Sequence, residues 1–537
     1  MPPPLARIDS LMEEAVAARV FPCGVVCFGA VDNSRTLGMP PFLPHFCRAY
    51  GAPTFESGHV PVGGTSVFDV ASLTKAMATT SAIVLLIERK VVNADAAVAS
   101  YLPWFADNGK DGVTLRHCLE HTSGLRPCFS LWENGARGAQ AARECLAAEV
   151  LRHAPGAGPP LYSDLGMIAL GFVVEELSGE RLDAFVRRRV FEPLGMHDTG
   201  FHALDIEPRC VADADAVGRA AWDDAAADGA WPLPPVASDS RVVPTEVDAI
   251  RGRLLWGEVH DPNAYLMGGV AGHAGLFTTA RDTAKFAACL LNGGTCVSSG
   301  RRVFSEETVA SFHGTSRAHF SAGWDTRERS RVTSRSGTPA CGRRMGVMTF
   351  GHLGFTGCSL WIDPSIRAFV LLFANAVHPT SDVGSPGDRI IGLRPAIADA
   401  AMDALLALRR PPLPPRRYAA LCLVPHSAQG RQGDRTHAIV PAPFTHSVEE
   451  APEAAGGGFL GGLFARAPVL GRVAGAALDA GLVVAAFTAT KAWFRRRFQN
   501  ATRRWEEGTG MPPSSPARSS PQSSRDGGDD PPSPSQG

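Results

Sequence analysis

The stretch FDVASLTK, residues 68–75, constrains this chain more than any other, because it sets Ser72 and Lys75 three residues apart where a helix-like run, residues 76–89, begins. Three residues is close to one helical turn, so both side chains would share one face. A serine hydroxyl is a poor nucleophile until a base takes its proton. A lysine amine can be that base when burial or neighbouring charge holds it neutral, and N–H groups at the helix start favour negative charge beside Ser72.

The composition restricts the class of protein. With 537 residues, 45% of them hydrophobic, the chain can bury a large core in more than one domain. A net charge of -1 gives no global attraction to nucleic acid, and we expect no nucleic-acid partner. Twelve cysteines without C-x-x-C pairs indicate reduced thiols. Residues 1–20 carry acids where a secretory signal needs an apolar core, so we expect a cytoplasmic protein.

Apolar and helical patterns alternate along residues 1–410 in a consistent order. Short apolar runs typical of strands lie near the two ends, at residues 24–30, 345–350, 358–362 and 368–374. Helical periodicity covers residues 5–20, 115–120, 139–151, 166–177, 182–190 and 390–408. This order predicts an α/β domain, about 1–75 and 300–410, interrupted by a helical part, about 76–299, with a site between them.

The chain changes character after residue 410. Residues 411–458 have the composition of a linker, and 508–537 that of a disordered tail. Residues 459–507 are apolar with basic residues interleaved, and their longest uncharged run, 480–490, is shorter than the ~20 residues of a spanning helix. An interfacial basic helix would give weak membrane-surface contact. A helical appendage on the catalytic body and a disordered segment are the alternatives.

Two further segments carry candidate chemistry. In LYSDLG, residues 161–166, a tyrosine phenol could shuttle the serine's proton if nearby cations lower its pKa. The alternative is a half-buried aromatic beside a helix cap formed by Ser163 or Asp164. In FGHLGFTG, residues 350–357, glycines would let a backbone approach a substrate and point an N–H at an oxyanion. The alternative is a bulge or tight bend.

Taken together, Ser72/Lys75, Tyr162/Asp164 and His352/Gly354 resemble the serine β-lactamase and penicillin-binding protein superfamily, most closely its class C-like branch. The resemblance covers residues 5–408. It is supported by the phrases VTLRHCLEHTSGL, FEPLGMHDTGF and GEVHDPNAYLMGGVAGHAGLF. It implies a β-lactamase/transpeptidase-like fold, with an antiparallel sheet flanked by helices and an inserted helical domain.

The resemblance also implies roles. Ser72 would form an acyl-enzyme, and Lys75 and Tyr162 would share general-base and general-acid work. The N–H groups of Ser72 and Phe355 would form an oxyanion hole, and His352 would line the pocket. No metal or other cofactor is expected.

Two residues depart from the family pattern. Asp164 stands where asparagine is usual, and its charge would keep Lys75 protonated and favour Tyr162 as the base. His352 stands where many relatives have a lysine, which removes a permanent cation for a substrate carboxylate. Both departures favour an esterase or amidase over an efficient β-lactamase.

Other patterns compete with this interpretation. Residues 117–121, HCLEH, spell an inverted zinc-peptidase signature, although they coincide with a family phrase and lack an identifiable third ligand. His273, within a glycine-rich loop, could contact substrate or relay a proton, or could simply be hydrogen-bonded inside the loop.

The sequence therefore predicts a serine acyl-hydrolase acting on an ester, an amide or a peptidoglycan fragment. The named candidates are a carboxylesterase, a DD-peptidase and a muropeptide amidase. A non-catalytic penicillin-recognising or scaffold protein with the same fold is the alternative, and a zinc peptidase is a distant one.

Overall fold

The structure is a computed structural model, and it describes residues 3–31, 44–56, 62–202, 241–312, 320–327, 338–382 and 384–408. The predicted linker, basic extension and tail, residues 411–537, lie outside the described residues. Within the part of the chain that is described, no helix is both long and apolar enough to cross a membrane.

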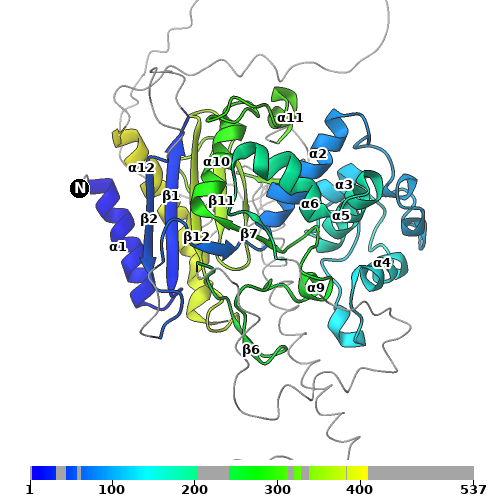
Figure 1. Cartoon of the computed structure of the whole chain (residues 1–537), viewed down its shortest axis with the longest axis horizontal. Helices are drawn as coiled ribbons and strands as arrows, with labels where there is room; N and C mark the ends of the chain where they lie inside the picture. Colours follow the sequence, from blue (N-terminus) through cyan, green and yellow to red (C-terminus); the bar gives the residue numbers. More distant parts are fainter. Residues whose placement is uncertain are drawn as a thin grey trace, which may run out of the picture. The chain divides into compact units, whose positions relative to one another are not determined.

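A seven-stranded antiparallel sheet forms the centre of the described region (Figure 1). Its strand order is β2-β1-β12-β11-β10-β9-β8, so strands from the two ends of the sequence lie side by side. The strands are β1 (Cys23–Ala30), β2 (Phe46–Gly51), β8 (Phe320–Ser321), β9 (Trp324–Thr326), β10 (Phe350–Leu353), β11 (Ser359–Asp363) and β12 (Ala368–Ala374).

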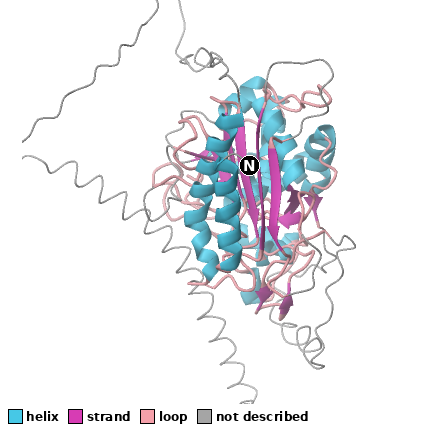
Figure 2. Cartoon of the chain, turned by 90° about the vertical axis from the view of Figure 1, so that its left-hand side faces the viewer, coloured by secondary structure: helices cyan, strands magenta, loops and turns pink. Residues whose placement is uncertain are grey.

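Both faces of this sheet are covered, which explains why its central strands are apolar throughout rather than alternating. Helices α1 (Pro3–Ala17) and α12 (Ile390–Leu408) pack side by side on one face (Figure 2). Val26 and Phe28 of β1 join the core beneath them. Val25 and Cys27 point to the opposite face, where α10 (Ala280–Leu291) packs against β1 and β12.

The helical part lies on the side of the sheet away from α1 and α12 (Figure 1). Its elements include η1 (Lys75–Thr80), a π-helical segment, then α2 (Ser81–Glu88), α3 (Leu115–Leu119), α4 (Ala139–Ala148), α5 (Asp164–Ser178) and α6 (Leu182–Val186). A small sheet, β3-β7-β4, lies beside it, formed by β3 (Val67–Asp69), β7 (Leu276–Thr279) and β4 (Gly200–Phe201). The remaining elements include β5 (Val247–Asp248), β6 (Arg253–Leu254), α9 (Pro262–Leu266) and α11 (Glu306–Ser311).

The predicted fold class is confirmed: an antiparallel sheet flanked by helices, with a helical part inserted between its strands. The strand predicted over 345–350 was wrong, because the chain turns there and β10 begins only at Phe350. Asp363 accepts the Gly346 N–H at 2.5 Å and holds this turn. Helix α10 packs on the sheet although it falls within range 76–299, and the domain boundaries stay a prediction.

An aromatic cluster fixes the far edge of the sheet and gives a test of the packing. Trp324 is buried, and its ring lies 5.1 Å from that of Phe350, 5.6 Å from Phe312 and 6.3 Å from Phe286. Trp324→Ala should lower the free energy of unfolding by about 3–5 kcal/mol, because the cavity cannot close. Urea denaturation followed by circular dichroism measures the change. Val347→Ala, at a 57% exposed position, is the matched control; equal losses in both variants would contradict the packing.

Candidate active site

A strained turn at the end of β3 presents Ser72. The buried Asp69 carboxylate accepts the Ala71 N–H at 2.8 Å, and Ala71 adopts φ 47°, in the left-handed region that non-glycine residues rarely enter. The Lys75 N–H donates to the Ser72 carbonyl at 3.1 Å and starts the helical segment. Ser72 therefore lies in the turn before the helix, held up by Asp69, rather than within the helix.

The Lys75 ammonium lies at the centre of the site. Its side chain is 1% exposed, and Nζ lies 2.8 Å from Ser72 Oγ, 2.9 Å from the His273 carbonyl and 2.8 Å from Asp164 Oδ1. These acceptors suit the N–H donors of a charged lysine, and Lys75 also hydrogen-bonds with Tyr162. The candidate base is therefore held in its charged form against the candidate nucleophile.

Tyr162 lies between two histidine rings beside this lysine. Its ring stacks on His121 at 4.6 Å and lies 6.1 Å from the ring of His352, while Lys75 Nζ lies 5.0 Å from its centre. His121 Nδ1 accepts the Ser163 N–H at 3.0 Å, just before α5 begins, and so fixes the backbone next to Tyr162. The Ser163 hydroxyl donates to the Arg126 carbonyl and does not cap the helix.

Burial and charge set the protonation states of these groups. Burial alone would lower the pKa of Lys75, but its interactions with Asp164 and Tyr162 together outweigh burial and raise that pKa. Burial also raises the pKa of Tyr162, although Lys75 opposes the shift, so the phenol is neutral at rest. Burial and then Lys75 lower the pKa of His352 to about 3, and the same two effects lower that of His121.

The end of β10 packs directly on the Ser72 turn. A Cβ on Gly354 would lie 2.5 Å from the Val70 carbonyl, so only glycine fits. The Thr356 hydroxyl donates to the Asp69 carbonyl at 2.8 Å. Both contacts place the backbone at Phe355, the predicted oxyanion donor, beside the turn that carries Ser72, while the Phe355 side chain is 43% exposed.

His273 supports the site through its backbone. Its imidazole Nε2 lies 2.8 Å from Asp261 Oδ1, and its carbonyl accepts a hydrogen bond from Lys75. Burial would raise the pKa of Asp261, but the charge of His273 lowers it. Contact between the His273 ring and a substrate stays a prediction.

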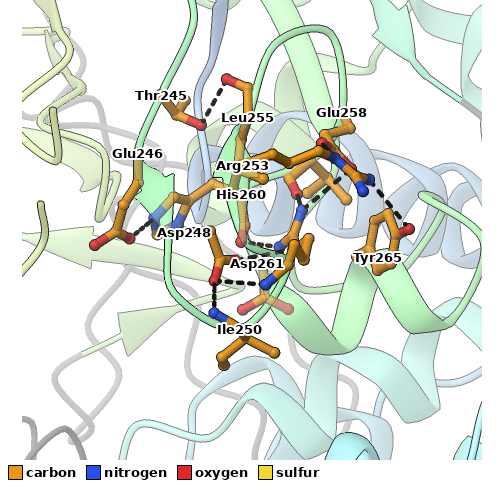
Figure 3. A network of polar contacts seen from close by, with 12 residues as sticks. Thr245, Glu246, Asp248, Ile250, Arg253, Leu255, Glu258, His260, Asp261 and Tyr265 are labelled. Atoms are coloured by element: carbon orange, nitrogen blue, oxygen red, sulfur yellow. Dashed lines mark hydrogen bonds and ion pairs between the residues drawn. The ribbon is translucent and has the colours of Figure 1, made fainter. Parts of the chain in front are cut away.

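Residues 257–273, called the strap here, connect the Ser72 turn with Lys75. The His260 N–H donates to Asp69 Oδ2 at 2.7 Å, and its Nε2 lies 2.7 Å from Glu246 Oε2 (Figure 3). Arg251, with a 2% exposed side chain, donates to the His260 carbonyl at 2.6 Å and pairs with Asp248 at 3.0 Å. The strap thus contacts the Ser72 turn through His260 and the lysine through the carbonyl of His273.

Residues 44–392 match the model of the family described as Beta-lactamase. This chain belongs to the beta-lactamase family. Its membership of this family, and its similarity to relatives named as carboxypeptidases, identify it as a serine hydrolase.

A relative from Escherichia coli (strain K12), named "Putative D-alanyl-D-alanine carboxypeptidase", is 32% identical over 361 residues, which are 62% of this chain and 76% of the relative. Two solved structures share the fold. Simvastatin synthase from Aspergillus terreus (a LovD6 mutant) has a TM-score of 0.52, is 18% identical, and covers 76% of this chain and 98% of its own. EstCE1, a hydrolase with promiscuous acyltransferase activity, has a TM-score of 0.51, is 20% identical, and covers 74% and 98%.

Asp69 is the residue of this site to which the sequence assigned no role. His121, His260 and Asp261 lie in the motif phrases, but the phrases do not reveal the contacts that these three residues make. Sequence spacing does not show which of them faces Ser72. Their burial against it became visible only in three dimensions.

The histidines of the zinc-peptidase pattern make separate contacts. The Thr114 N–H donates to His117 Nδ1 at 3.2 Å in a helix-capping box, whereas His121 accepts the Ser163 N–H. Within the described residues, no group of three or more His, Cys, Asp or Glu side chains is placed to hold a metal ion.

The close approach of β10 to the Ser72 turn is testable. Gly354→Ala should reduce the rate of serine acylation by at least about tenfold, because the new methyl group must displace either the Val70 carbonyl or Phe355. Gly392→Ala, which adds a methyl group to open space, is the matched control. Stopped-flow acylation by a chromogenic ester measures both, and unchanged acylation in Gly354→Ala would contradict the packing.

Proposed function

We propose that this enzyme hydrolyses an ester or amide through an acyl-serine intermediate on Ser72. The observation that carries the proposal is the buried Lys75 ammonium, bonded at once to the Ser72 hydroxyl and the Asp164 carboxylate. A non-catalytic penicillin-recognising protein would not need a buried lysine charge behind its serine, and burying a charged group is costly.

The proton of Ser72 has a short path. When Ser72 Oγ attacks the carbonyl carbon, the hydroxyl proton passes to Lys75 or to Tyr162. The residue that accepts the proton must be in its deprotonated form. Since both candidate bases are protonated at rest, the rate should rise with pH.

The remaining steps use groups beside Ser72. The N–H groups of Ser72 and Phe355 would hold the oxyanion, at about 3–4 kcal/mol per donor. As the bond to the leaving group breaks, the Tyr162 hydroxyl would donate a proton to that group. Water would then add to the acyl carbon and lose its proton to the same base, which returns a proton to Ser72 Oγ as the acyl bond breaks and the acid is released.

The environment of His352 supports an uncharged substrate group at this position. Its pKa of about 3 leaves the ring neutral at neutral pH, so it offers no cation to a carboxylate. We infer an ester or amide without a carboxylate there, as for a carboxylesterase or a muropeptide amidase. The D-alanyl-D-alanine carboxypeptidase named among the relatives is the second candidate. Parallel assays with a p-nitrophenyl ester and a D-alanyl-D-alanine peptide separate the two.

The acyl-serine is tested by Ser72→Ala. This variant should lose ester hydrolysis, by on the order of 10⁴-fold or more, and also labelling by a fluorophosphonate, because it removes the proposed nucleophile that Lys75 contacts. Ser100→Ala, a surface change, is the matched control. Intact-mass measurement after exposure to the fluorophosphonate and to a β-lactam reports the adducts. A full adduct on Ser72→Ala would refute the assignment.

The contribution of Asp164 is tested by Asp164→Asn, which keeps an oxygen acceptor for Lys75 and removes the charge. Asp164 raises the pKa of both Lys75 and Tyr162. Because the working base must be deprotonated, the rising limb of kcat/KM should move to lower pH in the variant, whichever of the two serves. The surface variant Asp95→Asn should leave the limb in place; an unmoved limb in Asp164→Asn would rule out this electrostatic role.

A further inference from the structure

Two cysteines face each other across β1 and the edge strand β2. Cys27 and Cys47 are direct partners in the antiparallel register. The Ala52 N–H donates to the Pro22 carbonyl at 3.1 Å, so pair 22/52 is a hydrogen-bonded pair of the same ladder. Hydrogen-bonded and non-hydrogen-bonded pairs alternate along such a ladder. Cys27 and Cys47 lie five positions along the ladder from pair 22/52. Because the two kinds of pair alternate, Cys27/Cys47 is a non-hydrogen-bonded pair.

The other side of β1 supports this count. The Val31 N–H donates to the Arg367 carbonyl and the Asn375 N–H donates to the Cys23 carbonyl, so the odd-numbered residues of β1 direct their backbone groups toward β12. The backbone of Cys27 therefore also faces β12, and its side chain meets that of Cys47.

This position suits a disulfide. In a non-hydrogen-bonded pair the Cα atoms are about 4.5 Å apart and the side chains are at their closest. A disulfide spans Cα separations of about 4.4–6.8 Å. The two thiols already hydrogen-bond to each other, so their sulfur atoms lie on facing sides.

The surroundings favour reaction at Cys47. Cys27 is buried and Cys47 is half-buried, so only the second is open to a reagent. A Cβ on Gly64 would lie 3.0 Å from Cys47 Sγ and 3.5 Å from Arg281 Nε, which places a guanidinium near the thiols. The hydrogen bond from Cys27 and the charge of Arg281 lower the pKa of Cys47 against the effect of burial, whereas burial raises that of Cys27. Thiolates are the reactive form.

We propose that Cys27 and Cys47 are a reversible redox site that a low-molecular-weight disulfide oxidises to a cross-strand disulfide. The Cys47 thiolate attacks one sulfur of the reagent, forms a mixed disulfide and releases one thiolate. The Cys27 sulfur then attacks Cys47 Sγ, gives up its proton and releases the second thiolate. The protein loses two hydrogens and two electrons are transferred, which convert the reagent disulfide into two thiols.

The Cys27–Cys47 disulfide would link the edge strand β2 covalently to β1. β2 pairs only with β1 in the described sheet, and the exchange closes a loop over residues 27–47. A closed loop restricts opening of the strand. Strands β12 and β11 separate β1 from β10, so the disulfide should stabilise β2 without altering acylation of Ser72.

The test uses the full chain, reduced and then exposed to oxidised glutathione. Free thiols are alkylated, and non-reducing peptide mapping locates the links. We expect two fewer alkylated thiols, one peptide pair joined through Cys27 and Cys47, reversal by dithiothreitol, and slower hydrogen exchange of β2 amides. A link between other cysteines, a stable glutathione adduct on Cys47, or no loss of alkylation would overturn the proposal.

Variants separate the two steps. Cys47→Ser keeps a hydrogen-bond partner for Cys27 and should abolish the link. Cys27→Ser should stop at the mixed disulfide on Cys47, because the resolving thiol is gone. Cys145→Ser, at another half-buried cysteine, is the matched control and should retain the link. Circular dichroism checks that each variant is folded. A persistent loss of two thiols in Cys47→Ser would contradict the pairing.

Discussion

The buried ammonium of Lys75 is the interaction on which the site depends. A lysine with a 1% exposed side chain would lose its proton if nothing compensated for the lost water, and Asp164 supplies that compensation at 2.8 Å. The ammonium also donates to Ser72 Oγ and to the His273 carbonyl. One charged group thus fixes the side chain of the nucleophile candidate, the start of α5 and the strap formed by residues 257–273 relative to one another.

This arrangement also explains why the sheet and the helical part occur in one fold. The Ser72 turn follows β3, Gly354 follows β10, and Asp164 starts α5, so the three motifs come from a small sheet, the large sheet and a helix. Two hydrogen bonds join other segments to the Ser72 turn: the Thr356 hydroxyl donates to the Asp69 carbonyl, and the His260 N–H donates to the Asp69 carboxylate. Asp69 accepts both hydrogen bonds, so this residue holds the Ser72 turn in position.

Local patterns predicted the elements well. The apolar runs at 24–30, 358–362 and 368–374 correspond to β1, β11 and β12, because strands buried on both faces are apolar throughout. The run at 345–350 failed because residues 346–349 form a turn held by Asp363, a partner distant in sequence. The motifs that indicated the family also predicted that Ser72, Lys75, Tyr162 and Asp164 lie together. Each motif is a short local stretch, so it can be recognised from the sequence alone. The contacts of His121 and His260 join segments far apart in sequence, and no spacing shows them.

The same limit applies to protonation and to cysteine pairing. The sequence analysis required cations to lower the pKa of Tyr162, yet burial raises it despite Lys75, and only the packing of His121 and His352 around the phenol shows this. Likewise, a cysteine count without C-x-x-C pairs indicates separate thiols, whereas the register of β1 and β2 puts Cys27 opposite Cys47. Because a shift of one residue would turn these side chains to opposite faces, the pairing depends on the register of the whole ladder. That register is fixed by the apolar residues of β1, which must face their two cores.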